Sequence, residues 1–285
     1  TLLASAIAVA TFSGSALAQE TMSASELAAK MDSMPTVYGN IQYVLYHDSV
    51  KGGESVVEHA DNGSTLGVKH EHEIASGITG FFKLELEGLA ADDKDRESGL
   101  EDVDEAYIGI KGDSFGQIWV GSDDSTYERA VDEISQYYEV ATLNIGADYT
   151  TGEGDMIQYS SPSFSGLTLM GAVQINGDGD DQTLSDKGGK KSYPYQLAAV
   201  YEMDALELAF AMDSNDGGGS ASNENTYGLR ASYDMGDLRV TGEYHTTKDA
   251  SDTYGVIGYY SMGANQFALS YEMNVADDAN DTETS

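Results

Sequence analysis

From Pro35 onward, apolar and polar residues alternate with a period of two, which indicates β-strands rather than helices. Segment 77–88 is the clearest case. One of its faces is apolar or small and consists of Ile78, Gly80, Phe82, Leu84 and Leu86. The other face is mostly polar and consists of Thr79, Phe81, Lys83, Glu85 and Glu87. Such a strand suits lipid on its first face and water on its second.

The same alternation recurs and predicts thirteen antiparallel strands. They are expected at residues 36–47, 64–73, 77–88, 102–112, 116–122, 155–161, 166–176, 192–202, 205–213, 226–234, 237–246, 253–261 and 265–274. Several have close to the nine to eleven or so residues that a tilted strand needs to cross a bilayer.

The connections between these strands alternate between short and long. Short turns are expected at 112–116, 203–204, 234–237 and 262–265, and long loops at 48–63, 89–101, 123–154, 177–191, 214–225 and 247–252. Short periplasmic turns and long external loops are typical of outer-membrane barrels. A soluble β-sandwich also alternates apolar and polar residues, but it rarely shows this asymmetry. We therefore predict an all-β, antiparallel transmembrane β-barrel.

The N-terminal residues have a different pattern. Residues 1–12 are apolar but too few to span a membrane, and Ala16-Leu17-Ala18 supplies a small-x-small cleavage site. We predict a signal peptide at 1–18, with a buried core helix as the alternative. Residues 19–34 are expected to be a periplasmic leader, either flexible or with a short capped helix.

The barrel itself is expected at 35–285. Residues 275–285 are hydrophilic and are predicted to begin an external loop. Because bacterial single-chain barrels have an even number of strands, we expect the C-terminal strands to be missing, along with a few N-terminal residues.

Composition narrows the class further. The chain has 285 residues, no Cys, and a formal net charge of −35 from 49 acidic and 14 basic residues. The absence of Cys excludes disulfide scaffolds and thiol chemistry. A strongly acidic chain is not expected to bind nucleic acid, because phosphate contacts need a basic surface.

Several segments resemble the Gram-negative general porins, the trimeric 16-stranded type. Residues 157–167 are similar to the family's Tyr-x-Ser-Pro-x-Phe-x-Gly hairpin turn, and residues 64–85 and 105–121 resemble two of its strand pairs. The likeness covers about residues 36–274, and about thirteen of the sixteen strands would be present. It implies a homotrimer in the outer membrane of a Gram-negative bacterium, in contact with lipid and lipopolysaccharide. Such a channel passes small hydrophilic solutes and ions and is not an enzyme.

The resemblance also implies that the third long loop folds into the channel and forms its constriction. The matching segment is Asp123–Glu153, which contains one base, Arg129. Its acidic candidates for the constriction are Asp123, Asp124, Glu128, Asp132, Glu133 and Glu139. Such an excess of carboxylates in a confined channel favours cations. Alternatively, most of these acids lie in the solvated outer part of the loop.

Strand alternation places a set of bases on the water-facing wall: Lys69, Lys83, Lys111, Arg230 and Arg239. If they face the acidic loop, the two sets create a transverse field across the channel. Alternatively, they only pair with wall acids such as Glu85, Glu105 and Glu243.

No cofactor, metal site or catalytic residue is assigned. The acidic segment 176–181 departs from the calcium-loop pattern, and His70 and His72 fit a rim pair better than a metal site. No Ser-His constellation is evident.

Three functions remain open. The first is a cation-preferring general-diffusion porin. The second is an oligosaccharide-specific porin with Tyr127, Tyr137 and Tyr138 as a stacking surface, and the third is a structural or adhesive surface protein.

Overall fold

The computed structural model describes residues 34–49, 55–88, 102–138, 145–147, 149–175, 193–216, 224–276 and 281–284. Pro35–Ser285 forms one compact unit. The predicted signal peptide, most of the leader, the acidic segment 176–181 and Glu139 lie outside the described residues.

The described residues form sixteen strands and two short helices. The strands are β1 (Thr36–Gly39), β2 (Tyr43–Ser49), β3 (Ser55–Asp61), β4 (Leu66–Ala75), β5 (Ile78–Glu87), β6 (Asp102–Gly112), β7 (Gly116–Ser122), β8 (Met156–Ser160), β9 (Leu167–Gln174), β10 (Tyr195–Met203), β11 (Leu206–Asp213), β12 (Thr226–Met235), β13 (Leu238–Thr247), β14 (Ser251–Met262), β15 (Asn265–Ala276) and β16 (Asp281–Thr284). The helices are α3 (Thr126–Val131) and α4 (Glu133–Tyr137). Within the described part of the chain, neither helix is long and apolar enough to cross a membrane.

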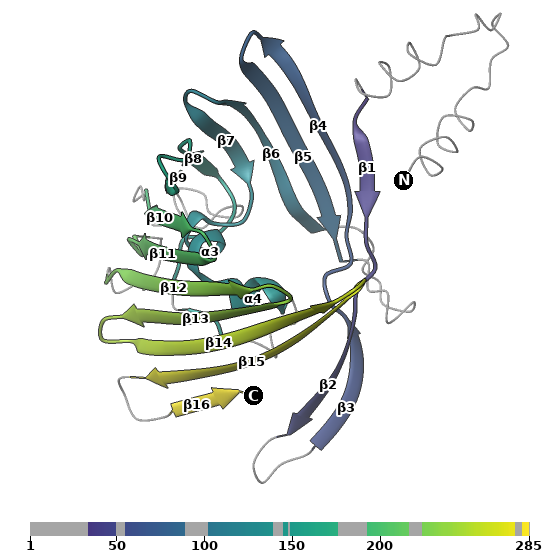
Figure 1. Ribbon diagram of the computed structural model, residues 1–285, viewed down its shortest axis with the longest axis vertical. Coiled ribbons are helices and arrows are strands. Elements are labelled where there is room, and N and C mark those ends of the chain that lie inside the picture. The colour runs from purple at the N-terminus through teal and green to yellow at the C-terminus, as the bar shows by residue number, and fades with distance from the viewer. Residues whose placement is uncertain are drawn as a thin grey trace, which may run out of the picture. The chain divides into compact units, whose positions relative to one another are not determined.

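Fourteen strands form one antiparallel sheet in the order β1-β4-β5-β6-β7-β8-β9-β10-β11-β12-β13-β14-β15-β16. Nearly every pair is therefore a hairpin of consecutive strands, as the alternation of turns and loops predicted. The sheet curves, and α3 and α4 lie on its concave side (Figure 1). β2 and β3 pair separately as a two-stranded sheet.

The first predicted strand is divided in the structure. β1 pairs with β4, but the ladder ends at Gly39. The next residues bond to the turn before β4 instead: Asn40 N donates to Thr65 O at 3.1 Å, and Gln42 N donates to Ser64 Oγ at 2.9 Å. β2 then pairs with β3, where residues 48–63 were predicted to be a loop. The prediction failed here because Ser55–Asp61 has no clear alternation of its own.

The C-terminal expectation also needs correction. Asp281–Thr284 was predicted to be part of an external loop, but its backbone pairs with residues 272–275 of β15. The pairing uses main-chain groups, so a hydrophilic sequence does not prevent it.

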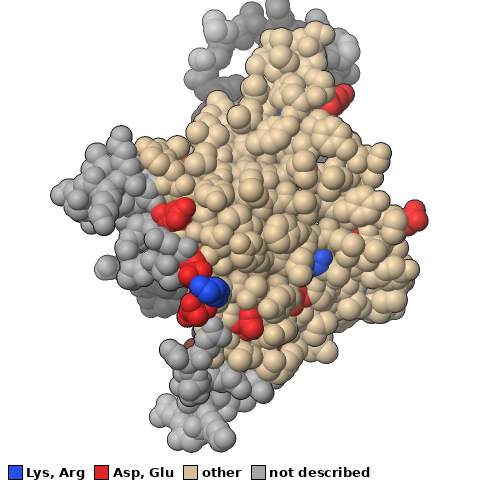
Figure 2. All heavy atoms as spheres, turned by 90° about the vertical axis from the view of Figure 1, so that its left-hand side faces the viewer, with Lys and Arg blue, Asp and Glu red and all other residues tan. Residues whose placement is uncertain are grey.

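The two faces of the fourteen-stranded sheet have opposite polarity. On β12, Tyr227, Leu229 and Tyr233 are exposed on the convex face, whereas Thr226 and Ser232 are buried on the concave face. The view onto the convex face is dominated by uncharged side chains (Figure 2). On β15, Leu269 is 81% exposed and Glu272 is 2% exposed. This inverted polarity is the arrangement expected of strands whose outer face meets lipid.

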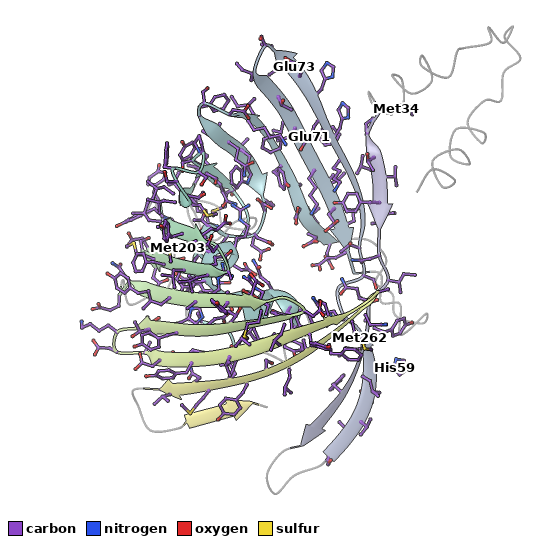
Figure 3. The ribbon with its side chains drawn as sticks, in the orientation of Figure 1. Met34, His59, Glu71, Glu73, Met203 and Met262 are labelled. Atoms are coloured by element: carbon purple, nitrogen blue, oxygen red, sulfur yellow. The ribbon has the colours of Figure 1, made fainter. Side chains whose placement is uncertain are left out.

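Aromatic side chains on the convex face form two bands. The band near the short turns contains Tyr201, Tyr233, Tyr260 and Phe267, and the band near the opposite strand ends contains Tyr195, Tyr227 and Tyr254. Met203 and Met262 lie at strand ends beyond the first band (Figure 3). Along β12, the distance from Tyr227 to Tyr233 is roughly 20 Å at about 3.4 Å per residue. Two aromatic girdles around an apolar band of about 25 Å characterise transmembrane barrels.

Candidate functional site

The segment from Asp123 to Glu153, which we call the inner loop, connects β7 to β8 and carries both helices. Ser125 caps α3, its Oγ accepting from Glu128 N at 3.2 Å. Asp132 ends α3 and caps α4, its Oδ1 accepting from Ser135 N at 3.3 Å. These two capping residues fix the path of the loop along the concave face of the sheet.

The first helix packs on a part of the wall made of small residues. Its buried cluster consists of Tyr127, Ala130 and Val131 of α3 with Ala198, Ala209 and Ala211 of β10 and β11. Gly228 of β12 completes this surface. A Cβ at Gly228 would lie 2.6 Å from both Tyr127 Oη and Val131 Cγ2. Only a wall without larger side chains allows α3 to approach this closely.

The second helix also packs against the wall opposite a glycine. Ile134 packs with Ile257 and Tyr259 of β14, and all three side chains are buried. A Cβ at Gly255 would lie 2.6 Å from Ile134 Cδ1. The two glycines therefore mark where the two helices of the inner loop are seated.

Side chains of the wall accept hydrogen bonds from the backbone of the loop. Gln196 Oε1 accepts from Tyr127 N at 2.9 Å. Glu243 Oε1 accepts from Glu133 N at 2.7 Å and from Ile134 N at 3.1 Å. Glu272 Oε2 accepts from Ile145 N at 2.8 Å. Buried backbone amides need such partners, so these wall residues hold the loop.

The start of the loop is fixed by a contact between Arg129, Asp123 and Trp119. Trp119 Nε1 donates to Asp123 Oδ2 at 2.7 Å, and Arg129 Nη1 lies 3.3 Å from the same oxygen. The guanidinium of Arg129 also lies 4.7 Å from the centroid of the Trp119 ring. Burial raises the pKa of Asp123, Arg129 offsets part of the effect, and Asp124 adds to it.

One loop carboxylate meets two of the predicted wall bases. Glu133 Oε2 lies 2.5 Å from Arg230 Nη1, and Glu133 Oε1 lies 3.3 Å from Arg239 Nε. Both arginines also pair with Glu207 of β11. Burial acts to raise the pKa of Glu133, but the hydrogen bonds from Arg239 and Arg230 outweigh it and lower the pKa. Two acids and two bases thus form a closed ring between loop and wall.

The structure places the three predicted lysines elsewhere. Lys83 pairs with Glu105 at 2.5 Å and with Glu85 at 3.5 Å. Lys111 pairs with Glu71, in the middle of β4, at 2.6 Å (Figure 3). Lys69 Nζ lies 5.0 Å from the centroid of the Tyr38 ring. Lys83 and Lys111 therefore pair with wall acids, which was the alternative considered for the basic residues.

Carboxylates gather in two groups of three near the start of the loop. Each residue of a group brings an oxygen within 4.8 Å of the others: Glu85, Asp104 and Glu105 in one group, and Asp124, Glu128 and Glu153 in the other. The charges of Asp123 and Asp124 also act on Glu105. Burial raises the pKa of Glu128 to about 8, with a further increase from Asp124, Glu153 and Asp132.

A polar pocket of about 460 Å³ lies beside α4. Its lining includes Glu133, Gln136, Tyr137, Arg239 and Tyr259. The rings of Tyr137 and Tyr259 meet edge to face at 5.2 Å. Tyr127, the third aromatic candidate from the sequence, is fully buried, so it cannot stack on a solute.

The wall residues that hold the loop were missed by sequence reasoning. Gln158 accepts from Thr126 Oγ1 at 2.8 Å and donates to Asp124 O at 2.9 Å. Gln196, Glu243 and Glu272 act in the same way. The sequence does indicate that these residues face water, because they occupy the polar positions of alternating strands. Alternation alone does not show which of these residues the loop covers.

An outward apolar face, an inward polar face and a loop bound on the inner wall define a channel protein of the outer membrane. A family model described as Gram-negative porin matches residues 4–285, so the chain belongs to this family. Members of the family are channels, and the chain is a porin of the Gram-negative outer membrane.

Two curated relatives are similar over most of their length. They are the "Monosaccharide porin" of Halomonas sp and the "Major outer membrane protein" of Halomonas elongata. Each is 29% identical over 286 residues, which cover 93% of this chain and 75% of the relative.

Solved structures share the fold. Salmonella typhi OmpF in complex with daunomycin is 15% identical with a TM-score of 0.64, over 89% of this chain and 84% of that chain. A mutant of the Rh. blastica porin is also 15% identical, with a TM-score of 0.59 over 87% of both chains. These likenesses confirm the predicted class of antiparallel porin barrel.

Proposed function

We propose that this porin is a passive general-diffusion channel that prefers cations. The observation that carries the proposal is the pair of carboxylate groups, Glu85–Asp104–Glu105 on the wall and Asp124–Glu128–Glu153 on the inner loop. The described ion pairs of these groups and the adjacent Asp123 involve two bases, Lys83 and Arg129. The surplus of negative charge would attract cations and repel anions in a narrow, low-dielectric passage.

Other loop acids contribute less to this field. Glu133 is neutralised by Arg230 and Arg239, and Asp132 is 1% exposed. The proposed selectivity therefore rests on the start of the inner loop rather than on α4. Asp124 is the residue whose charge is expected to matter most, and Glu128 adds to it only as pH rises towards its raised pKa of about 8.

Ion selectivity can be measured as the reversal potential of the reconstituted channel under a KCl gradient. We expect a cation-selective potential in the wild type and a clear shift towards zero in the triple variant Asp124→Asn, Glu128→Gln, Glu153→Gln. As a matched single change, Asp124→Asn should shift the potential more than Asp249→Asn, because Asp249 lies on an exposed turn beside Lys248. Anion preference in the wild type, or a triple variant with unchanged selectivity, would overturn the proposal.

The proposal includes assembly as a homotrimer in contact with lipid and lipopolysaccharide, a signal peptide at 1–18 and a leader at 19–34. The family resemblance and the apolar convex face support this assembly. Three equal closure steps of one inserted unit would support the trimer, and closure in a single step would contradict it.

A second candidate is a saccharide-selective channel, favoured by the pocket beside α4. Tyr137 and Tyr259 offer aromatic faces next to the charged groups of Glu133 and Arg239. One curated relative is also named a monosaccharide porin. Saturable block of the ion current by one sugar, weakened by Tyr137→Ala, would support this function. A current that sugars reduce only in proportion to their viscosity would exclude it.

A further inference from the structure

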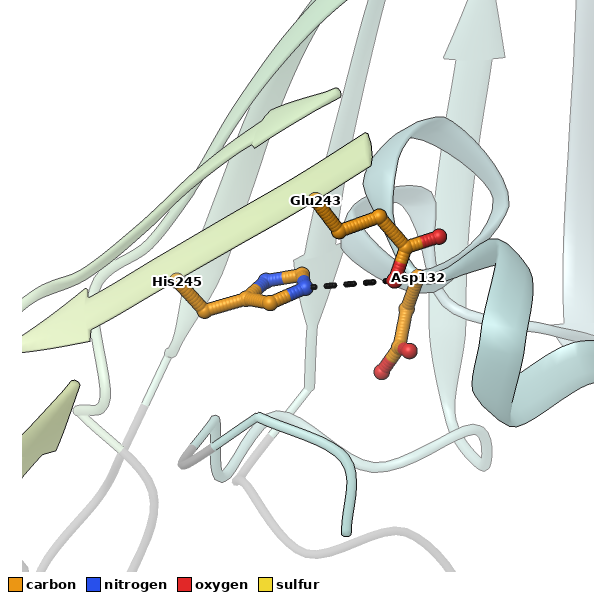
Figure 4. Close-up of side chains that lie close together, drawn as sticks. All are labelled: Asp132, Glu243 and His245. Atoms are coloured by element: carbon orange, nitrogen blue, oxygen red, sulfur yellow. Dashed lines mark ion pairs between the residues drawn. The ribbon is translucent and has the colours of Figure 1, made fainter. Parts of the chain in front are cut away.

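Three side chains from two distant parts of the chain meet where the inner loop touches β13. Asp132 lies between α3 and α4, and Glu243 and His245 occupy neighbouring inward positions of β13 (Figure 4). One oxygen or nitrogen from each lies within 4.8 Å of the others, and His245 Nε2 is 3.7 Å from Glu243 Oε2. The exposed fractions of Asp132, Glu243 and His245 are 1%, 5% and 2%.

Each of the three side chains uses one polar atom to hold the fold. Asp132 Oδ1 accepts from Ser135 N, and Glu243 Oε1 accepts from the first two amides of α4. His245 Nδ1 is hydrogen-bonded to Tyr127 Oη at 2.8 Å. The other polar atom of each residue, Asp132 Oδ2, Glu243 Oε2 and His245 Nε2, has no hydrogen-bond partner among the described residues. Three such buried atoms in one cluster would be costly unless something binds them.

Among the described residues, no lysine or arginine forms an ion pair with the cluster. The nearby arginines, Arg230 and Arg239, form their ion pairs with Glu133, Glu207 and Asp234. Glu272 adds negative charge close to Asp132. A desolvated group of carboxylates beside an imidazole therefore needs a cation or bound protons to be stable.

We propose that Asp132 Oδ2, Glu243 Oε2 and His245 Nε2 bind a divalent transition-metal cation, best matched by Zn²⁺, that fastens the inner loop to the wall. One imidazole nitrogen with two carboxylate oxygens is a Zn²⁺-type ligand set, and the imidazole disfavours Ca²⁺ and Mg²⁺. Bonds of about 2.0–2.2 Å place the ligand atoms of a tetrahedral Zn²⁺ roughly 3.5 Å apart. The observed 3.7 Å between His245 Nε2 and Glu243 Oε2 is close to that spacing.

Tyr127 has the role of an orienting partner. Its hydroxyl holds Nδ1 of His245, so that Nε2 points towards the two carboxylates. Partners of this kind commonly change metal affinity by about 10- to 100-fold when removed. The site is independent of the proposed ion selectivity and of any saccharide, because its atoms are buried behind the loop.

The test is equilibrium dialysis of the purified full chain in detergent against Zn²⁺ at pH 7.5, with bound metal measured by mass spectrometry. Half-buried His70 and exposed His72, whose ring centroids lie 6.1 Å apart, form a competing site on β4. All measurements therefore use the His70→Gln, His72→Gln background. We expect about one Zn²⁺ per chain and, with Co²⁺, the intense visible absorption of a four-coordinate N/O site.

Variants separate ligation from folding. Glu243→Gln and Asp132→Asn keep an amide oxygen for the backbone hydrogen bonds, and His245→Gln removes the imidazole. Each should weaken Zn²⁺ binding at least tenfold, as should Tyr127→Phe. Electrophoretic heat-modifiability shows which variants fold, and the three other variants suffice if one does not.

Two results would overturn the proposal. One is the absence of stoichiometric Zn²⁺ in the background protein, which would indicate a cluster held by protons alone. The other is binding that survives Glu243→Gln, Asp132→Asn and His245→Gln in folded protein.

Discussion

The two halves of the concave wall use polar residues in different ways. On strands β10 to β15, polar side chains such as Gln196, Glu243 and Glu272 accept hydrogen bonds from the inner loop and are buried beneath it. On strands β5 and β6, Lys83 and Glu105 pair with each other across the wall. One half is a seat for the loop, and the other half carries charge.

The difference shows that a polar residue at a water-facing strand position can have either of two roles, binding the loop or carrying charge. In the seat, alanine and glycine alternate with hydrogen-bond acceptors, because α3 and α4 need both space and partners. In the charged half, Lys83 pairs with Glu85 and Glu105 of the wall itself. We therefore expect substitutions in the seat to move the loop, and substitutions in the charged half to change selectivity while leaving the loop in place.

The largest effect is expected from Gly228→Val. The new side chain would collide with Tyr127 and Val131, whose atoms lie 2.6 Å from the position of its Cβ. Overpacking of this kind costs about 1–3 kcal/mol, and displacement of α3 should raise single-channel conductance. Gly258→Val is the control on the opposite face of the sheet, because a Cβ there meets nothing within 4 Å. Equal conductance in the two variants would show that α3 does not narrow the channel.

Glu133→Gln should have the next largest effect, because it removes the charge that joins the seat to the loop. Arg230 and Arg239 would keep only Glu207 and Asp234 as ion-pair partners. Loss of a partner for partly buried charges costs about 1–3 kcal/mol, to be measured by urea unfolding in detergent. Selectivity should also shift towards anions, and an unchanged reversal potential would place this ring outside the ion path.

A smaller effect is expected from pH. The folded-state pKa of Glu128 is raised to about 8, mainly by burial and further by Asp124, Glu153 and Asp132. Because the pKa of Glu128 is higher in the folded state than its ordinary value of 4.5, protonation of Glu128 stabilises the fold. This contribution to stability is fully present below pH 4.5 and is lost as pH rises through about 8.

Between those pH values, stability should therefore fall while cation preference increases. Thermal unfolding and reversal potentials across this range test both trends. Glu128→Gln should flatten them, and a variant with the wild-type pH profile would assign the titration to another group.

Lys83→Met should have the smallest effect on stability, about 1 kcal/mol or less, because its ion pairs lie in the charged half and are partly solvated. It should still increase cation preference, because Glu85 and Glu105 lose their base. A large loss of stability with no change in selectivity would mean that this half of the wall is structural as well.

Much of the fold could be predicted because alternation and turn residues are local. Gly116–Ser122 and Asp102–Gly112 form strands with the predicted bounds. β3 was missed because its residues do not alternate, and β16 because backbone pairing does not need apolar side chains. Both depend on a neighbouring strand rather than on their own sequence.

The candidate site was less predictable. Strand alternation predicted water-facing positions for Arg230 and Arg239, and in the structure both pair with Glu133 of the loop that the resemblance indicated. The sequence does not show that Asp132 lies buried against His245 and Glu243, because that requires the path of the loop across β13. Nor does it distinguish Glu243, an acceptor beneath the loop, from Glu105, which pairs with Lys83.

The seat has a consequence for the design of chimeric channels. Wall residues that hydrogen-bond to the inner loop are spread from Gln158 on β8 to Glu272 on β15. They therefore cannot be transferred together with the loop as one short segment. A loop transplanted from another porin would lack wall glycines opposite its own helices and wall side chains that accept hydrogen bonds from its backbone. In this protein, pore engineering by loop exchange therefore has to redesign more than half of the wall, whereas point changes in the charged half leave the loop's support intact.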